Sequence, residues 1–189
     1  YIMNSRDNCL IEYLNKLREV GICSFKIEGR NKTIYYLSVV AKAYRKAIDD
    51  MMAGLEFDPA GLDELNRIAN RGYIPGFMKG FPGSGNVKLD AQSEDQVCKF
   101  IGVIREVGSK GDDDLYRIEV RNRVEVGDEI EVVVPPAKGA DGENVKVKIG
   151  EMISLNDEKV DAAHGGDKDV YFRLEKGLPE GGLLRIYMS

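Results

Sequence analysis

The spacing of the apolar residues changes once along the chain, at a stretch rich in glycine and proline, Gly76–Gly85. Before this stretch, apolar residues recur every three or four positions, which is typical of amphipathic helices. After it, short β-rich runs are separated by Gly, Asp and Asn, which is typical of strands joined by tight turns. A chain of 189 residues is long enough for two such units, so we predict a two-part α+β protein.

The charges divide at about the same place. Residues 1–90 hold 13 basic and 11 acidic side chains, and the remaining residues hold 14 basic and 21 acidic ones. The net charge of −5 therefore combines a slightly basic first part with an acidic second part. No apolar run approaches the roughly 20 residues that a membrane helix needs, so we expect no membrane partner.

Cysteine and histidine are scarce. Cys9, Cys23 and Cys98 are widely spaced and form no C-x-x-C pair, so the sequence indicates neither a disulfide framework nor a self-contained zinc site. We therefore expect reduced thiols in a cytoplasmic protein. The single histidine, His164, excludes any site that needs two histidines.

The first part is expected to alternate strands and helices. The run Ile22–Ile27, bounded by two glycines, is predicted to be a strand, and Tyr1–Met3 is a candidate for the end of another. Two longer helices and a short third one are predicted around these runs, at Leu10–Leu17, at Leu37–Met51 and from Asp58-Pro59 to about Ala69. The order strand, helix, strand, helix favours a parallel sheet with crossover helices.

A sheet of two parallel strands is not stable alone, because both of its faces and both of its edges need cover. We therefore expect that strands flanking Tyr1–Met3 and Ile22–Ile27 are missing and that Tyr1 is a truncated start.

The second part is predicted to be all strand, in a small barrel or sandwich. The predicted strands are Phe100–Glu106, Leu115–Arg121, Glu129–Val134, Val145–Met152, Asp169–Leu174 and Leu183–Tyr187.

Three charged residues are candidates for a catalytic site in the first part. On the predicted strand, alternation places Lys26, Glu28 and Arg30 on one face. A parallel strand is covered on both faces, and charges in a covered interior are costly unless they are paired or serve a site. A structural ion cluster is the alternative interpretation.

The residues that follow are a candidate anion site. Arg30 and Lys32 lie beside the start of the second long helix, where free backbone N–H groups attract anions. The alternative is a simple helix cap, formed by Asn31 or Thr33, with solvated charges beside it.

Several blocks of the sequence resemble the U32 (collagenase-like) peptidase family. The resemblance runs along nearly the whole chain and is to the C-terminal third of the proteins in that family. The blocks are Tyr1–Ile11, Ser24–Lys32 (Ser-Phe-Lys-Ile-Glu-Gly-Arg-Asn-Lys), Tyr35–Ala47, Glu64–Arg67 with Arg71–Phe77, and Glu119–Ile130.

This resemblance implies a division into domains. Residues 1–80 would be the last two βα units of a (β/α)₈ catalytic barrel with a short helix and loop, and residues 81–95 a linker. Residues 96–189 would form a small six-stranded β-barrel similar to the second domain of elongation factor Tu. The N-terminal barrel of the full-length chain would then be a missing partner of this piece.

The resemblance also implies a function. Some members of the family are named proteases, and others hydroxylate tRNA or rRNA bases. We therefore expect the full-length parent to hydroxylate an RNA nucleobase, with Lys26, Glu28 and Arg30 in catalysis. By position, Cys9 resembles one of four cysteines that hold an iron–sulfur cluster, so this piece alone is expected to hold no cofactor and to be inactive.

The expected partner is tRNA or rRNA and not DNA, with Lys32, Arg121 and Arg123 as candidate phosphate contacts. Pairing of the last two arginines with Glu119, Glu125 or Asp128 is the alternative, since the second part is acidic. Two other functions stay open: a genuine protease, or a C-terminal β-barrel that serves as an RNA-binding or protein-binding module.

Overall fold

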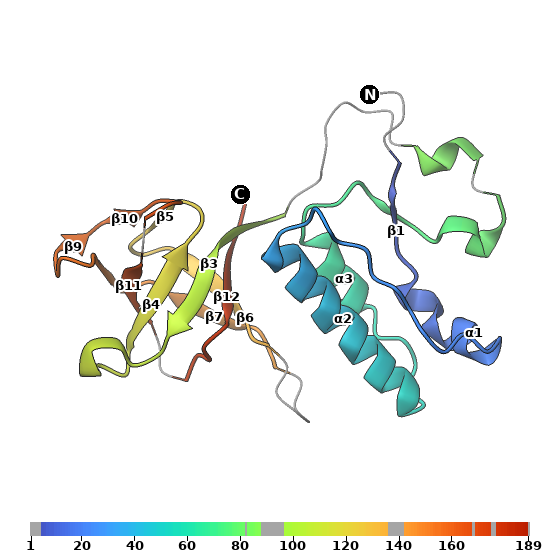
Figure 1. Cartoon of the computed structure of the whole chain (residues 1–189), viewed down its shortest axis with the longest axis horizontal. Helices are drawn as coiled ribbons and strands as arrows, with labels where there is room; N and C mark the ends of the chain where they lie inside the picture. The colour runs from blue at the N-terminus through green and yellow to red at the C-terminus, as the bar shows by residue number, and fades with distance from the viewer. Residues whose placement is uncertain are drawn as a thin grey trace. The chain divides into compact units, whose positions relative to one another are not determined.

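The computed structural model describes residues 5–81, 83–87, 97–135, 142–167, 169–174 and 177–188. The chain divides into two compact units, unit 1 (Tyr1–Val97) and unit 2 (Cys98–Ser189), which differ in secondary structure (Figure 1). Tyr1–Met3 and most of the predicted linker, residues 81–95, lie outside the described residues.

The α-helices described in unit 1 are α1 (Leu14–Glu19), α2 (Ile34–Met52) and α3 (Ala60–Asn66). A 3₁₀ turn, η1 (Ile11–Tyr13), precedes α1, so the first predicted helix is confirmed in a shorter form. The second is confirmed, and its N-cap is Thr33, whose hydroxyl accepts a hydrogen bond from the N–H of Tyr36 at 3.2 Å. The third begins one residue later than predicted and ends at Asn66, not near Ala69.

Two very short strands tie the two ends of unit 1 together. β1 (Asp7–Asn8) pairs in parallel with β2 (Tyr73–Ile74), so Asp7 lies opposite Tyr73. Two further 3₁₀ turns follow β2, at η2 (Gly76–Lys79) and η3 (Gly83–Asn86). The apolar core of the unit includes Ile11, Val39, Leu65 and Ile68, each at most 1% exposed.

The predicted strand Ile22–Ile27 is wrong. Residues 22–29 form no helix or strand, and most of their side chains are exposed. A strand exists only where a neighbour accepts its hydrogen bonds, and no described strand of unit 1 pairs with this segment. The alternation of charged and apolar residues therefore describes an extended loop in this structure.

Unit 2 contains one large antiparallel sheet in the order β7-β6-β12-β3-β4-β11-β8-β9, with β10 and β5 as a separate pair. The strands are β3 (Cys98–Glu106), β4 (Leu115–Val120), β5 (Val124–Glu125), β6 (Glu129–Val133), β7 (Val145–Lys148), β8 (Glu151–Ile153), β9 (Lys159–Val160), β10 (Ala162–Ala163), β11 (Val170–Arg173) and β12 (Leu183–Tyr187).

Each of the six segments predicted to be a strand contains one, but unit 2 has more strands than the six predicted. Residues 145–152 are predicted to be one strand but form two, β7 and β8. The division falls at Ile149 and Gly150, whose N–H groups donate to the backbone carbonyl oxygens of Asp128 and Arg173. Among the described residues, β7 and β9 are the open edges of the sheet. The sheet is therefore a curled half-barrel and not a closed six-stranded barrel.

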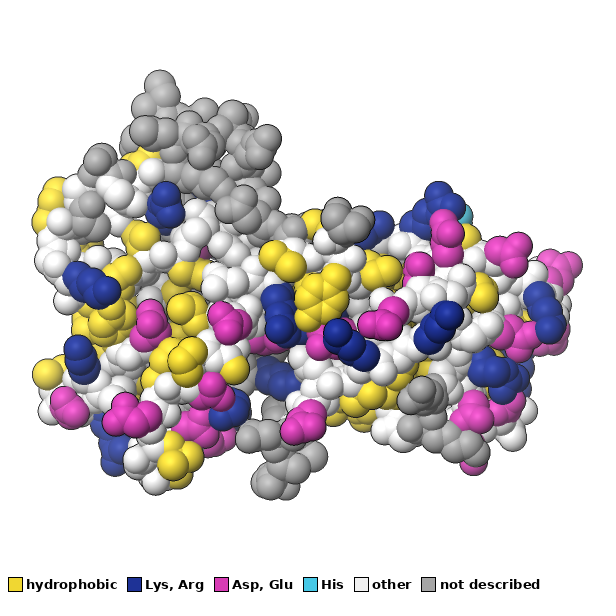
Figure 2. All heavy atoms as spheres, turned by 180° about the vertical axis from the view of Figure 1, so that it is seen from behind, with side chains coloured by type: hydrophobic (Ala, Val, Ile, Leu, Met, Phe, Trp, Pro, Cys, Tyr) yellow, Lys and Arg dark blue, Asp and Glu magenta, His cyan; other side chains and the backbone are white. Residues whose placement is uncertain are grey.

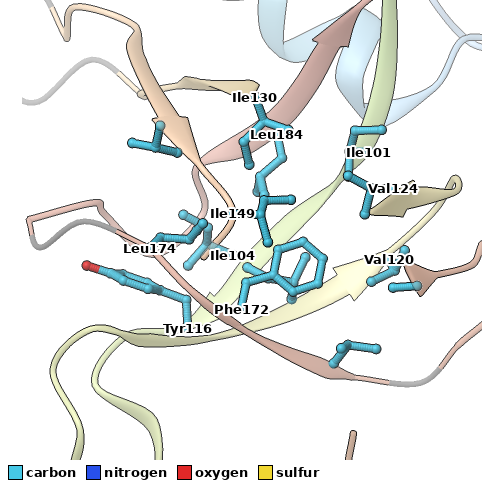
Figure 3. Close-up of a cluster of buried hydrophobic side chains, with 14 of the residues drawn as sticks. Ile101, Ile104, Tyr116, Val120, Val124, Ile130, Ile149, Phe172, Leu174 and Leu184 are labelled. Atoms are coloured by element: carbon cyan, nitrogen blue, oxygen red, sulfur yellow. The ribbon is translucent and has the colours of Figure 1, made fainter. Parts of the chain in front are cut away.

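The sheet curls around a single apolar core, which Figure 3 shows in close-up. Phe172, Tyr116 and Ile104 are fully buried there, Ile101 joins them from the same strand as Ile104, and Ile130 and Leu184 come from β6 and β12. Burial of apolar surface on this scale is the main force that holds a small domain together.

None of the helices in the described part of the chain is long and apolar enough to cross a membrane. The cytoplasmic location stays a prediction.

Candidate functional site

A pocket of about 640 Å³ opens in unit 1. Its walls come from β1, the loop at residues 22–28, helix α2 and the segment that leads into β2. The charged residues in the lining are four cations against two carboxylates, so the pocket carries an excess of positive charge; they are Arg6, Lys26, Lys32, Arg71, Asp7 and Glu28. Three tyrosines, Tyr36, Tyr44 and Tyr73, also line it.

Cys9 and Tyr44 meet in the wall of this pocket. Cys9 is 8% exposed, and its Sγ lies 3.6 Å from the hydroxyl oxygen of Tyr44. The same hydroxyl accepts a hydrogen bond from the N–H of Leu10 at 3.1 Å. Burial, followed by the electrostatic influence of the neighbouring Cys9, raises the pKa of Tyr44 well above its usual range. Tyr44 therefore presents a neutral hydroxyl beside the thiol.

Asp7 and Arg71 form a second fixed group of the pocket. The guanidinium of Arg71 donates to Asp7 Oδ1 through Nε at 3.0 Å and through a terminal nitrogen at 2.5 Å, and its backbone N–H donates to Asp7 Oδ2 at 3.2 Å. Asp7 is only 11% exposed, and Arg71 is about a third exposed. The carboxylate thus holds the guanidinium in place while part of the guanidinium still faces solvent.

Tyr73 lies beside this pair because β1 and β2 are paired in register. Its hydroxyl donates to the carbonyl oxygen of Leu65 at 3.1 Å, which fixes the ring. Burial, followed by the electrostatic influence of the neighbouring Tyr36, raises the pKa of Tyr73 above its usual range. An aromatic face, a fixed guanidinium and a buried thiol therefore share one pocket.

The predicted catalytic residues do not form a buried cluster. Lys26 pairs with Glu28 at 3.0 Å, but the two side chains are 83% and 73% exposed, and Arg30 is exposed as well. The expectation that they point into a covered interior is wrong because their segment is a loop. Lys26 and Glu28 still line the pocket, at its solvent side.

The predicted anion site is only partly formed. Thr33, one of the two candidate caps, satisfies the start of α2. The ammonium of Lys32 lies over the ring of Tyr36, 4.8 Å from its centroid, and lines the pocket.

The two candidate arginines of unit 2 pair with carboxylates, as the alternative interpretation predicted. Arg121 pairs with Glu119, and Arg123 pairs with Glu125 at 2.6 Å. Glu119 also pairs with Arg105, whose hydrogen bond to it lowers the pKa of Glu119 below its usual range. On the face drawn in Figure 2, basic and acidic side chains alternate without a large area of one sign. The charges of these arginines are thus largely balanced.

The described residues do not fit an iron–sulfur cluster. Such a cluster needs four thiolates, and in unit 1 Cys9 is buried in the pocket wall while Cys23 is exposed. The third cysteine, Cys98, is buried in the first strand of unit 2. No group of three or more metal-binding side chains occurs in the described parts of the chain. His164 is exposed in a loop.

Sequence reasoning missed the residues that shape this pocket. Tyr44 falls within the helix predicted at Leu37–Met51, and nothing in its neighbourhood in the sequence indicates that it meets Cys9, 35 positions earlier. Asp7 and Arg71 are 64 positions apart. Asp7 and Arg71 are brought together by the parallel pairing of β1 with β2. This pairing involves only two residues on each strand, so it leaves no periodic pattern in the sequence.

Two family models match the chain, one after the other. Residues 1–88 match "Peptidase family U32", and residues 96–185 match "Peptidase family U32 C-terminal domain". The chain belongs to peptidase family U32.

Curated U32 relatives carry two kinds of name. The "tRNA hydroxylation protein P" of Haemophilus influenzae is 33% identical over 180 residues, which are 94% of this chain and 37% of that protein. The "tRNA hydroxylation protein P1" of Bacillus subtilis is 30% identical over 98% of this chain and 43% of its own length. A "Collagenase" of Porphyromonas gingivalis is 32% identical over 84 residues, 42% of this chain and 23% of that protein. The chain thus spans less than half the length of these relatives.

Among solved structures, the C-terminal domain of a U32 peptidase from Geobacillus thermoleovorans is similar to this chain. The match covers 48% of this chain and 93% of the other, with 20% identity and a TM-score of 0.40.

Proposed function

We propose that this chain is part of a protein that hydroxylates a nucleobase of tRNA. The observation that carries the proposal is the 33% identity to a tRNA hydroxylation protein along 94% of the chain, because this similarity runs through both units. The B. subtilis relative with a similar name extends over 98% of the chain and supports the same substrate class. rRNA is the alternative substrate.

The pocket of unit 1 supports a nucleotide ligand. Its excess positive charge favours a phosphate, and its tyrosine rings offer faces on which a base can stack. Arg71, held by Asp7, can donate to a phosphate or to a base edge without first losing the freedom of its side chain. A volume of about 640 Å³ is in the range of pockets that bind small ligands.

We further propose that residues 1–189 alone are inactive. A catalytic site needs its groups held in place before the substrate arrives. The ammonium of Lys26 and the carboxylate of Glu28, at the solvent side of the pocket, lie on an exposed loop. Measurable modification of tRNA by purified residues 1–189 would disprove this proposal.

The test of the proposed function is mass spectrometry of tRNA nucleosides from a strain that lacks the gene. We expect loss of a hydroxylated nucleoside, and its return when the full-length gene is supplied again. Full-length genes with Arg71→Gln or Cys9→Ser should restore little of it, whereas Arg45→Gln, an exposed residue on α2 outside the pocket, should restore all of it. An unchanged nucleoside profile in the deletion strain would refute the proposal.

Proteolysis is the second candidate, because the P. gingivalis relative is named a collagenase. In the described pocket the hydrogen-bonding neighbour of the Cys9 thiol is Tyr44, whose raised pKa makes it a poor general base at neutral pH. Gelatin cleavage by the purified full-length protein, abolished by Cys9→Ser, would favour the protease over the hydroxylation protein.

A further inference from the structure

Two phenylalanine side chains that follow β2 in unit 1 are exposed to solvent. Phe77, in η2, is 72% exposed, and Phe81, shortly after it, is 86% exposed. Their ring centroids are 6.2 Å apart, with the ring planes inclined by 38°. Burial of a phenylalanine side chain is worth roughly 1.5–3 kcal/mol, so two exposed rings at one place indicate a surface that a ligand or another part of the full-length protein covers.

The backbone holds this pair next to the pocket. η2 begins two residues after β2, and Gly76 at its start has a φ of +58°. A Cβ on Gly76 would lie 2.9 Å from Oδ1 of Asn8, so the start of η2 packs against Asn8, which itself lines the pocket. The two rings therefore follow directly from a wall of the pocket.

The surroundings favour a nucleic acid as the ligand. Lys79 lies between the two phenylalanines in sequence, and the adjoining pocket has an excess of positive charge. Exposed aromatic rings interleaved with basic side chains are the usual platform for unpaired bases, because every base has a face that stacks and every nucleotide carries a phosphate. A purely apolar contact, with another protein or with the rest of the full-length chain, makes no use of these cations.

We propose that Phe77 and Phe81 form a stacking platform for unpaired RNA bases that flank the nucleotide held in the pocket. This inference rests on the proposed function and says which side chains bind the RNA bases on either side of the modified nucleotide. Enzymes that act on a base take it out of its stack and commonly contact the flanking nucleotides, whose lost stacking the protein then replaces. Lys79 supplies a phosphate contact beside the rings.

The test is binding of tRNA from the deletion strain to the full-length protein, measured by fluorescence anisotropy. Phe77→Ala and Phe81→Ala should each weaken binding by roughly 5-fold to 150-fold, the range known for loss of one stacked base. Lys79→Gln should lower the slope of log affinity against log salt by about 0.7. Met52→Ala, which removes a 62% exposed apolar side chain at the end of α2, should change neither quantity.

Conservative variants distinguish stacking from apolar contact. Phe77→Tyr and Phe81→Tyr keep a ring face and should bind within about 3-fold of the wild type, whereas the leucine variants keep only apolar surface and should resemble the alanine variants. Circular dichroism confirms that each variant is folded. Equal binding by wild-type and alanine variants, or recovery by leucine as good as by tyrosine, would overturn the proposal and indicate a protein contact.

The proposed function can fail separately. If the deletion strain keeps its hydroxylated nucleosides, that function is refuted whatever the binding data show. If hydroxylation depends on the gene but the alanine variants bind tRNA normally, only the stacking platform is refuted.

Discussion

Arg185 forms an ion pair with Glu131 inside unit 2. The Arg185 side chain is fully buried, and its guanidinium donates to Glu131 Oε2 at 2.6 Å. The hydroxyl of Tyr187 donates to the same oxygen at 3.1 Å. Arg185 lies where the pairing of β12 with β3 shifts register, so a local irregularity of the strand accompanies its burial.

Removal of the guanidinium should strongly destabilise unit 2. Arg185→Met leaves a carboxylate in a nearly water-free site, and loss of one partner of a buried pair costs about 3–5 kcal/mol. The double variant Arg185→Met, Glu131→Leu removes both charges and should recover most of that loss. Urea unfolding followed by circular dichroism measures both. A double variant no more stable than the single one would show that the pair matters through its packing and not through its charge.

Tyr44 should make the stability of unit 1 sensitive to alkaline pH. Its pKa in the folded chain is raised above the ordinary value of 10.0, chiefly by burial, so the folded state keeps the phenol proton longer than the unfolded state does. This contribution is fully present below pH 10 and is lost as the pH rises towards the raised pKa.

We therefore expect the urea midpoint of unit 1 to fall more steeply above pH 10 in the wild type than in Tyr44→Phe. Tyr73→Phe should have the same effect, since burial raises the pKa of that tyrosine too. The measurement is a series of unfolding curves from pH 8 to pH 11, followed by the helix signal. Parallel curves for the wild type and both variants would contradict the burial of these hydroxyls.

At the scale of the elements, the pairing of β3 with β4 depends on Gly102. A Cβ at this position would lie 2.4 Å from the carbonyl oxygen of Glu119 on β4 and 3.1 Å from Cγ2 of Ile118. The first contact is with backbone, which cannot move away without breaking the ladder.

Gly102→Ala should therefore destabilise unit 2 by about 1–3 kcal/mol, the range for overpacking. Gly150→Ala is the matched control, because its nearest neighbour would be the carbonyl oxygen of Arg173 at an ordinary 3.6 Å. That change should stay within about 0.5 kcal/mol. Comparable losses in the two variants, measured by urea unfolding, would show that close contact with β4 is not what requires glycine at position 102.

The elements differ in how far the sequence predicts them, for a physical reason. The strand Leu183–Tyr187 has the bounds that the sequence predicts, and it forms because β3 and β6 of the same unit supply its hydrogen bonds. Ile22–Ile27 has an equally good strand pattern but no described partner, and it is a loop. The sequence pattern of a segment indicates which of its faces is apolar, but a strand forms only if a neighbouring strand pairs with it.

The candidate site was less predictable than the fold. Only the family resemblance indicates Cys9, and Tyr44 and Arg71 owe their places to contacts across 35 and 64 positions. The alternation of charges at Lys26 and Glu28 points to the segment that lines the pocket. It predicts that these two side chains are buried, whereas both are exposed.

At the scale of the whole molecule, each of the two units has its own apolar core. The large buried cluster of unit 2 draws its members from residues between Ile101 and Leu184 only. Unit 2 should therefore fold without unit 1. We expect residues 98–189, produced alone, to show a β-sheet circular dichroism spectrum and a single cooperative urea transition, with a free energy of unfolding within about 5–15 kcal/mol. The β-sheet transition of the whole chain should have the same midpoint. A stand-alone unit 2 that is unfolded, or whose midpoint rises when unit 1 is restored, would show that the two units share stability.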